Sequence, residues 1–308
     1  MSYDGILIIN KEKGYTSNDV VSVLRGILKM KKIGHTGTLD PEATGVLPVC
    51  IGKATKTVGL ITERDKEYSA VARLGVTTDT EDMTGRVLSR TDIPEGSEPG
   101  LEAVKEAFLS FKGKYEQIPP MYSAKKVNGR KLYELAREGV TIERKPCTVE
   151  IKDIVIKGYD FPLVSLSVSC GKGTYIRSLI RDAGERLGTG AAMESLERIR
   201  VSEYSIKDAL TLKEVEELVF KGEIEGYIKS TESLFSSLPS ITVRGRAEAL
   251  LKNGNSFSVP ETFNNGEYRV HFFGWCFCGG LLHKERTGKA GKDVFVIDST
   301  YDSISWYR

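Results

Sequence analysis

The sequence of 308 residues predicts an α+β protein in which a mixed-sheet domain is followed by a small, strand-rich domain. Strand-like and helix-like segments follow one another in irregular order up to about residue 235, which favours an α+β core over repeated βαβ units. Residues 230–239 have a linker-like composition rich in serine, and short strand patterns separated by glycines come after them. We therefore place the two domains at residues 1–235 and 239–308.

Apolar spacing and capping residues place the longer elements of the first domain. The apolar run at residues 6–9 predicts a buried strand, and residues 20–28 have helical spacing after the capping residues 16–18. Alternating apolar side chains over residues 68–74 predict a half-buried strand. The same criteria predict helices at residues 101–111, 130–137 and 175–187, and strands at residues 148–156 and 163–170.

The second domain is predicted to be a small β-barrel of roughly 70 residues. A short helix at residues 246–251, closed by Asn253 and Gly254, comes before its main strands. The strands are expected at residues 268–273, 274–278 and 294–297. This pattern resembles a PUA domain, an RNA-binding module, so we call the region PUA-like.

Charge and composition limit the classes of function. Lys and Arg total 44 and Asp and Glu total 42, so a formal net charge of +2 gives no global sign of nucleic-acid binding. A phosphate-binding surface must therefore come from local clusters, although such clusters are often only solvated faces. The candidate RNA-binding residues in these clusters are Lys31, Lys32, Lys125, Lys126 and Arg130.

The sequence also indicates the cellular compartment through its apolar runs, its first residues and its cysteines. The sequence has no apolar run long enough to cross a membrane and no basic leader before its first strand. Its five cysteines are odd in number and irregularly spaced, as expected for free thiols in a reducing environment. We expect a cytoplasmic protein.

The most distinctive segment covers residues 34–47 and reads Gly-His-Thr-Gly-Thr-Leu-Asp-Pro-Glu-Ala-Thr-Gly-Val-Leu. Its glycines permit tight turns or a close approach to a ligand. Pro41 fixes its own φ and biases Asp40 towards an extended conformation. The segment therefore predicts a stiff loop that presents the Asp40 carboxylate.

This loop resembles the catalytic loop of the TruB-type pseudouridine synthases, which reads G-H-x-G-T-L-D-P-x-A-x-G-x-L. Five further segments recur in that family in the same order, at residues 66–68, 73–85, 118–124, 129–139 and 173–179. The resemblance covers most of residues 5–200. Two departures are visible, because Lys11-Glu12 stands where the family commonly has Lys-Pro, and Gly171-Lys172 where it often has Ser-Lys.

The resemblance implies isomerisation of uridine to pseudouridine at position 55 in the T-arm of tRNA. Asp40 matches the family's nucleophile, which adds either to the base or to the ribose. Arg177 matches the guanidinium beside it, which would lower the pKa of the carboxyl and keep it ionised. Tyr68 matches the aromatic residue that stacks on the target base and assists proton removal at C5.

The family's substrate contacts fall on four further positions. His35 matches the residue at the point where the target nucleotide flips out of the T-arm. Asp82 matches the acidic partner of the catalytic arginine, and Tyr175 and Leu196 match substrate-binding positions. A monomer is expected, and neither guide RNA, metal nor organic cofactor is implied, since the reaction neither oxidises nor hydrolyses.

Two rivals remain open at this point. An RNA-guided synthase of the dyskerin type shares the catalytic motif, but such proteins usually carry long extensions that this chain lacks. A tRNA-folding chaperone would bind the same RNA with catalysis as a secondary property. Activity on an isolated T-arm hairpin, without guide RNA, would separate these three possibilities.

Overall fold

The computed structural model describes residues 3–127, 129–242 and 244–252, and the backbone of five short strands beyond them. The helices are α1 (Ser17–Leu28), α2 (Val58–Thr62), α3 (Leu101–Leu109), α4 (Leu132–Arg137), α5 (Ile176–Arg186), α6 (Leu212–Lys221) and α7 (Arg246–Lys252). Short 3-10 helices are η1 (Gly52–Thr57), η2 (Ile206–Asp208), η3 (Ile224–Tyr227) and η4 (Thr231–Phe235).

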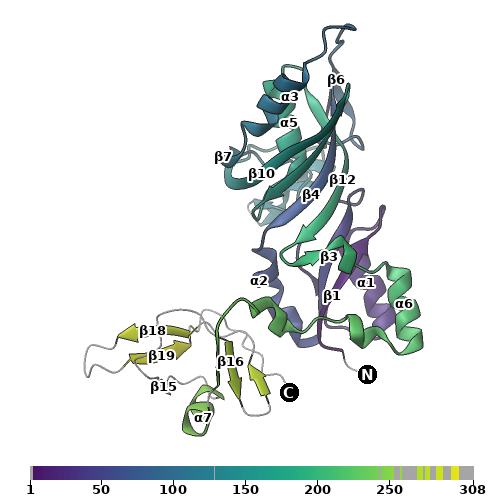
Figure 1. Cartoon of the computed structure of the whole chain (residues 1–308). Helices are drawn as coiled ribbons and strands as arrows, with labels where there is room; N and C mark the ends of the chain where they lie inside the picture. The colour runs from purple at the N-terminus through teal and green to yellow at the C-terminus, as the bar shows by residue number, and fades with distance from the viewer. Residues whose placement is uncertain are drawn as a thin grey trace.

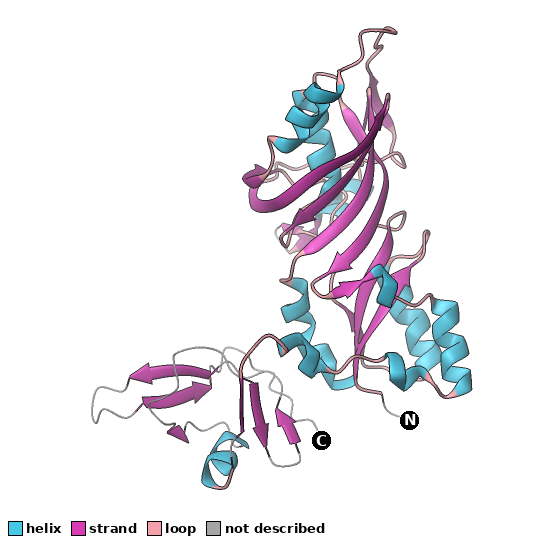
Figure 2. Cartoon of the chain, viewed as in Figure 1, coloured by secondary structure: helices cyan, strands magenta, loops and turns pink. Residues whose placement is uncertain are grey.

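One mixed sheet of nine strands runs through the described part of the chain (Figures 1 and 2). Its strands are β1 (Gly5–Lys11), β2 (Ile33–His35), β3 (Thr44–Ile51), β4 (Lys66–Leu74), β7 (Gly113–Gln117), β10 (Cys147–Asp160), β11 (Leu163–Cys170), β12 (Ala191–Val201) and β13 (Tyr204–Ser205). The main order is β1-β3-β12-β4-β11-β10-β7, with β2 paired to β3 and β13 to β12. All pairs are antiparallel except β12 with β3. The expected mixed sheet is confirmed.

The parallel contact between β12 and β3 joins two halves of the sheet. On one side, α3 and α5 pack against β4, β10 and β12, and this core contains Phe108, Leu166 and Leu179 (Figure 1). On the other side, α1 and α6 lie together beside β1. Strand β1 is buried on both faces, so its apolar residues form a continuous run, as in strands covered on both sides.

Helix α1 shows why the local sequence signals worked. Thr16 caps it, because its hydroxyl accepts a hydrogen bond from the Asp19 amide at 3.1 Å while the Asp19 carboxylate accepts one from the Thr16 amide at 2.8 Å. Such a cap stabilises a helix by about 1 kcal/mol. Lys29 then adopts the left-handed conformation with φ of 53° and ends the helix.

Two sequence expectations need correction. The helix expected at residues 130–137 begins only at Leu132, because Arg130–Lys131 forms strand β9 and pairs with β8 (Lys126–Val127). The linker-like stretch is structured in part: within η4, Leu234 and Phe235 are buried in the same cluster as Ile6. The stretch therefore packs against the first domain in part and is not a free linker.

The strands of the C-terminal region form two small sheets in the described residues. Their order is β14-β16-β17 and β15-β19-β18. The strands are β14 (Ser240–Thr242), β15 (Phe257–Ser258), β16 (Arg269–Phe272), β17 (Trp275–Phe277), β18 (Leu282–Arg286) and β19 (Asp293–Ile297). Strands are therefore found where they were expected, whereas the Asn253-Gly254 end of the helix lies outside the described residues. Across the described ranges, no helix has the length and apolar character needed to cross a membrane.

Candidate active site

The Asp40 loop connects β2 to β3 and is fastened to its surroundings by backbone contacts. The Leu39 amide donates to the Ser17 hydroxyl at 2.9 Å, which ties the loop to the start of α1. The Ala43 amide donates to the Asp40 carbonyl at 3.1 Å and closes a tight turn around Pro41. The Asp40 side chain is thus presented by a constrained backbone, as its sequence predicts.

Lys11, the last residue of β1, contacts the same loop. Its side chain is completely buried, and its ammonium donates to the carbonyls of Tyr15 at 2.7 Å and of Glu12 and Pro41 at 3.0 Å. Burial lowers the pKa of Lys11 to about 8, although the charges of Asp40 and Glu42 oppose that shift. Lys11 thus keeps its contacts with the loop, and the departure from Lys-Pro changes only the next residue, which is Glu12 instead of proline.

Arg177 approaches Asp40 from the first turn of α5. The chain is fixed just before that helix by Gln117, whose amide group accepts from the Tyr175 amide at 2.9 Å and donates to the Tyr175 carbonyl at 3.0 Å. Gln117 is buried, so this pair of hydrogen bonds is shielded from water. It sets where the helix begins and so where Arg177 points.

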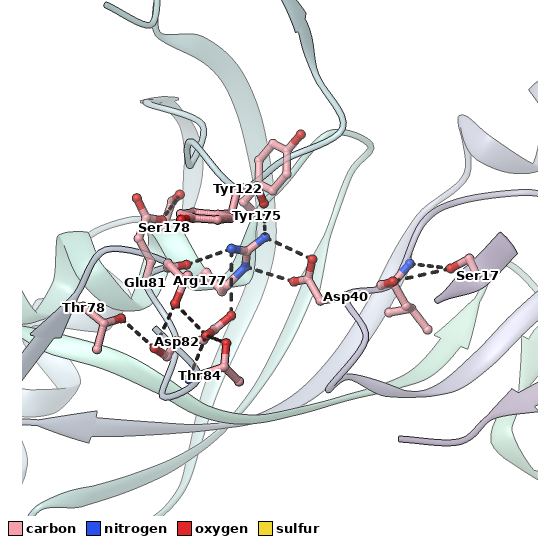
Figure 3. A network of polar contacts seen from close by, with 12 residues as sticks. Ser17, Asp40, Thr78, Glu81, Asp82, Thr84, Tyr122, Tyr175, Arg177 and Ser178 are labelled. Atoms are coloured by element: carbon pink, nitrogen blue, oxygen red, sulfur yellow. Dashed lines mark hydrogen bonds and ion pairs between the residues drawn. The ribbon is translucent and has the colours of Figure 1, made fainter. Parts of the chain in front are cut away.

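Arg177 holds the Asp40 carboxylate with two nitrogens (Figure 3). Its Nε lies 2.9 Å from Oδ2, and its Nη2 donates to Oδ1 at 3.0 Å. The arginine side chain is 4% exposed, whereas the aspartate side chain is 34% exposed. A fixed, buried fork therefore aims a carboxylate that a substrate can still reach.

The remaining donors of Arg177 are bound by two other loops. Nη1 donates to the Thr80 carbonyl at 2.8 Å and lies 3.9 Å from the Asp82 carboxylate, and Nη2 also donates to the Tyr122 carbonyl at 2.8 Å. Asp82 in turn accepts hydrogen bonds from the Thr84 amide and hydroxyl at 3.0 and 2.6 Å. The guanidinium is therefore held in one orientation by the loops at residues 79–84 and 118–123.

The pKa of the Asp40 carboxyl shifts in the direction opposite to the one expected from the sequence. Burial raises the pKa of Asp40 above its ordinary value, the Arg177 charge lowers it, and the neighbouring Asp82 charge raises it. We expected the arginine to dominate. Burial and a second carboxylate outweigh it, so the Asp40 carboxyl takes up a proton at a higher pH than an exposed aspartate does.

The other predicted site residues lie around this centre at different depths. Tyr68 in β4 is 7% exposed and belongs to the same buried cluster as Leu39 and Leu196. Burial raises the pKa of the Tyr68 hydroxyl, although the Arg198 charge opposes that shift. The phenol is therefore protonated at neutral pH. His35, half-buried at the end of β2, has its pKa lowered by burial and by the Arg198 charge, so it is neutral there.

The predicted RNA-binding residues are exposed to different extents. Lys31, Lys32 and Lys126 are exposed. The Lys125 ammonium contacts the Cys147 thiol, and Arg130 pairs with the Glu138 carboxylate. The last two side chains therefore already have partners within the protein.

Arg198 in β12 is a site-forming residue that sequence reasoning missed. It is buried, and it donates to the Val46 carbonyl at 2.7 Å and to the Gly37 carbonyl at 3.2 Å. It thereby joins β12 to the Asp40 loop at Gly37 and to the first residues of β3 at Val46. Its position two residues after Leu196, on the same strand face, was the available signal. The described residues contain no cluster of His, Cys, Asp and Glu suited to a metal ion.

Comparisons with known proteins place this site in a family. Residues 25–176 match the N-terminal domain of the TruB family pseudouridylate synthases, and residues 177–236 match the tRNA pseudouridylate synthase B C-terminal domain. The chain belongs to the TruB family of pseudouridylate synthases. The segments that match this family include every residue of the Asp40–Arg177–Asp82 cluster.

Curated relatives agree over most of the length of this TruB family member. A protein of Lachnoclostridium phytofermentans is 52% identical over 84% of this chain and 86% of its own. Proteins of Clostridium kluyveri and Staphylococcus aureus are 42% and 44% identical, covering 92% and 88% of this chain and 96% and 90% of their own. All three are named tRNA pseudouridine synthase B.

Solved structures share the fold at lower identity. A Cbf5-Nop10-Gar1 complex contains a chain with a TM-score of 0.68 and 25% identity, matched over 96% of this chain and 84% of that one. An H/ACA RNP bound to a substrate RNA containing 2'-deoxyuridine contains one with a TM-score of 0.66 and 25% identity, over the same shares of both chains.

Proposed function

We propose that this protein isomerises uridine to pseudouridine at position 55 in the T-arm of tRNA, with Asp40 as the nucleophile and without guide RNA. The observation that carries the proposal is the fork of Arg177 on a partly exposed Asp40. The names of the relatives at 42–52% identity support tRNA as the substrate. The likeness to the chains of the Cbf5-Nop10-Gar1 complex and of the H/ACA RNP is weaker, at 25% identity.

Asp40 performs the reaction by covalent catalysis. Its ionised carboxylate adds to the uracil ring or to C1′ of the ribose while the N1–C1′ bond breaks, and both routes are compatible with this geometry. The uracil then turns, C5 bonds to C1′ and the carboxylate leaves. C5 gives up its proton, and N1, which kept the electron pair of the broken N1–C1′ bond, takes one up. Arg177 keeps the carboxylate aimed throughout, because it holds both Asp40 oxygens while the Thr80 and Tyr122 carbonyls fix the guanidinium from two other loops.

Tyr68, His35, Tyr175 and Leu196 complete the substrate site. Tyr68 stacks on the target base, a contact whose loss costs about 1–3 kcal/mol in other base-stacking proteins. Its protonated hydroxyl favours this role over proton removal. A neutral His35 suits packing against the T-arm where the nucleotide leaves the stack.

Phosphate contacts come from the exposed basic residues near the site. Lys31 and Lys32 directly precede β2, and Lys126 lies in the β8–β9 ribbon. Lys125 and Arg130 join them if RNA displaces their present partners, Cys147 and Glu138. Such contacts position the RNA without reading its sequence.

Residues 1–235 form the catalytic domain in this proposal, and residues 239–308 form a PUA-like barrel that binds RNA. The two small sheets of the C-terminal region support a strand-rich module. The protein acts in the cytoplasm as a monomer and needs no metal or organic cofactor, because the isomerisation is neither a redox reaction nor a hydrolysis.

The test is a pseudouridine-mapping assay on an unmodified T-arm hairpin incubated with the purified protein alone. Pseudouridine at the position equivalent to 55 supports the proposal. Formation only after addition of a guide RNA indicates the H/ACA-like alternative. Tight binding of the hairpin without any pseudouridine indicates a binding-only protein.

A further inference from the structure

Helix α5 carries a second arginine one turn after Arg177, and its contacts repeat those of the first. The Arg181 guanidinium pairs with the Glu81 carboxylate and with that of the neighbouring Asp182, the latter at 2.6 Å, and its Nη2 donates to the Ile118 carbonyl at 3.3 Å. Arg177 reaches Thr80 in the first of these loops and Tyr122 in the second. Both arginines therefore join α5 to the loops at residues 79–84 and 118–123.

Glu81 is the centre of this second layer. Its side chain is 9% exposed, and its Oε1 pairs with Arg181. Its Oε2 accepts a hydrogen bond from the Ser178 hydroxyl at 2.6 Å (Figure 3). Both carboxylate oxygens are thus bound by α5, one by the residue next to Arg177 and one by the residue one turn later. Burial raises the pKa of the Glu81 carboxyl, while Arg181 and Ser178 oppose that shift.

The backbone at Glu81 is also unusual. Its φ of 65° lies in the left-handed region, which is uncommon for a residue other than glycine. The Glu81 carbonyl accepts from the Met193 amide at 3.0 Å, and the Met83 amide donates to the Met193 carbonyl at 3.0 Å. Side-chain and strand contacts on both sides therefore hold a bend between Thr80 and Asp82, the two residues of this loop that contact Arg177.

We propose that Glu81 and Arg181 form a positioning pair, which keeps the Thr80 carbonyl and the Asp82 carboxylate in place for Arg177 and so keeps Asp40 aimed. The inference rests on the proposed function, because its effect is measured on pseudouridine formation. It assigns no contact with the substrate to either residue. A buried ion pair contributes little net stability over a neutral replacement, which makes positioning the more informative role to test.

The experiment compares single-turnover rates and hairpin affinities of Glu81→Gln, Arg181→Met and the double variant with those of the wild type. Each variant should react at least about tenfold more slowly, as expected when reacting groups are slightly misplaced, with hairpin affinity changed less than about threefold. In the double variant, melting temperature should lie above that of Arg181→Met, because Glu81→Gln removes one of the two carboxylates that Arg181 neutralises and only Asp182 is then left without its partner, while the rate should stay low. Glu102→Gln, at an exposed ion pair with Lys105 on α3, is the matched control and should keep the wild-type rate.

The decisive comparison repeats Glu81→Gln in an Arg177→Lys background. If Glu81 acts through Arg177, its substitution should cost much less there than in the wild type, because linked residues are not additive. Glu81→Gln within twofold of the wild-type rate, an equal cost in both backgrounds, or a double variant whose rate recovers with its melting temperature would overturn the inference. An inactive wild type would instead reject the proposed function itself.

Discussion

At the scale of single residues, the site pairs a buried, fixed arginine, Arg177, with a partly exposed carboxylate, Asp40. The Arg177 side chain is 4% exposed and its guanidinium is held by two further loops, whereas the Asp40 side chain is 34% exposed and its carboxylate is bound by Arg177. The two residues are 137 positions apart in the sequence, so spacing alone does not bring them together. Their pairing was predicted only from the resemblance to the TruB family, and the distances now give it a physical form.

Arg177→Lys should lower the single-turnover rate about a hundredfold, corresponding to about 3 kcal/mol of lost transition-state stabilisation. A lysine keeps the charge, but it offers one nitrogen where Arg177 uses Nε and Nη2 on Asp40 and other donors on Thr80 and Tyr122. The measurement is the rate on a T-arm hairpin at saturating enzyme. A variant nearly as fast as the wild type would show that only the charge matters.

Asp82→Asn should move the acid limb of the pH–rate profile to lower pH. The nucleophile must be ionised, and the Asp82 charge raises the pKa of Asp40, so removal of that charge lets Asp40 stay ionised at lower pH. Arg177→Met should move the limb the other way, because the Arg177 charge lowers the same pKa. Single-turnover rates measured across the acid range test both signs, and a shared direction for the two variants would contradict this electrostatic account.

The carbonyl partners of two buried cations could not be predicted from the sequence, although the place of Arg198 two residues after Leu196 was a signal for that residue. Lys11 and Arg198 are completely or almost completely buried, although their residue types are usually exposed. Their role depends on backbone carbonyls of the Asp40 loop, and no side-chain pattern marks which carbonyls need donors. Only the folded arrangement of β1, β12 and the loop reveals them.

At the scale of elements, helices and strands with clear caps or clear apolar alternation were predicted correctly, and strands with interrupted patterns were not. The caps of α1 and the alternation of β4 follow local rules, and both elements form where they were expected. Strand β3 was not predicted, since Pro48 lies within it and proline argues against a paired strand. Strand β12 was also missed, because charged residues such as Glu197 and Arg198 interrupt its apolar pattern.

The segment at residues 120–139 should gain hydrogen-exchange protection when the T-arm hairpin binds. It contains the short β8–β9 ribbon and α4, and most of its side chains are exposed or half-buried in the described residues. Such segments open easily, and RNA contacts would hold this one closed over Arg177 through Tyr122. Strand β4, in the middle of the sheet, serves as the internal reference and should not change. Equal protection of the segment with and without hairpin would rule out closure on the RNA.

At the scale of the whole molecule, the mixed sheet determines where chemistry can occur. The Asp40 loop leaves β2 in one half of the sheet, and α5 packs on the other half, so the ion pair spans the junction between β3 and β12 (Figure 1). The sequence predicted the fold class but not this junction, because the parallel contact of β12 with β3 involves strands about 150 residues apart.

A protein shortened to residues 1–238 should retain activity on the hairpin but bind full-length tRNA more weakly and with a shallower salt dependence. The PUA-like region supplies phosphate contacts in our proposal, and each lost contact reduces the salt slope by about one. The shortened chain keeps η4 and its packing on β1. Affinity for tRNA measured against salt concentration tests this, and an unchanged affinity and slope would remove the RNA-binding role of residues 239–308.

The most direct test of the account is the activity of Asp40→Asn on the T-arm hairpin. Asparagine keeps the size of the side chain and can still accept from Arg177, but it cannot act as a carboxylate nucleophile. We expect no pseudouridine in a single-turnover assay, with hairpin affinity within about tenfold of the wild type because phosphate contacts dominate binding. A variant that forms pseudouridine at a tenth of the wild-type rate or faster would contradict the assignment of Asp40 as the nucleophile.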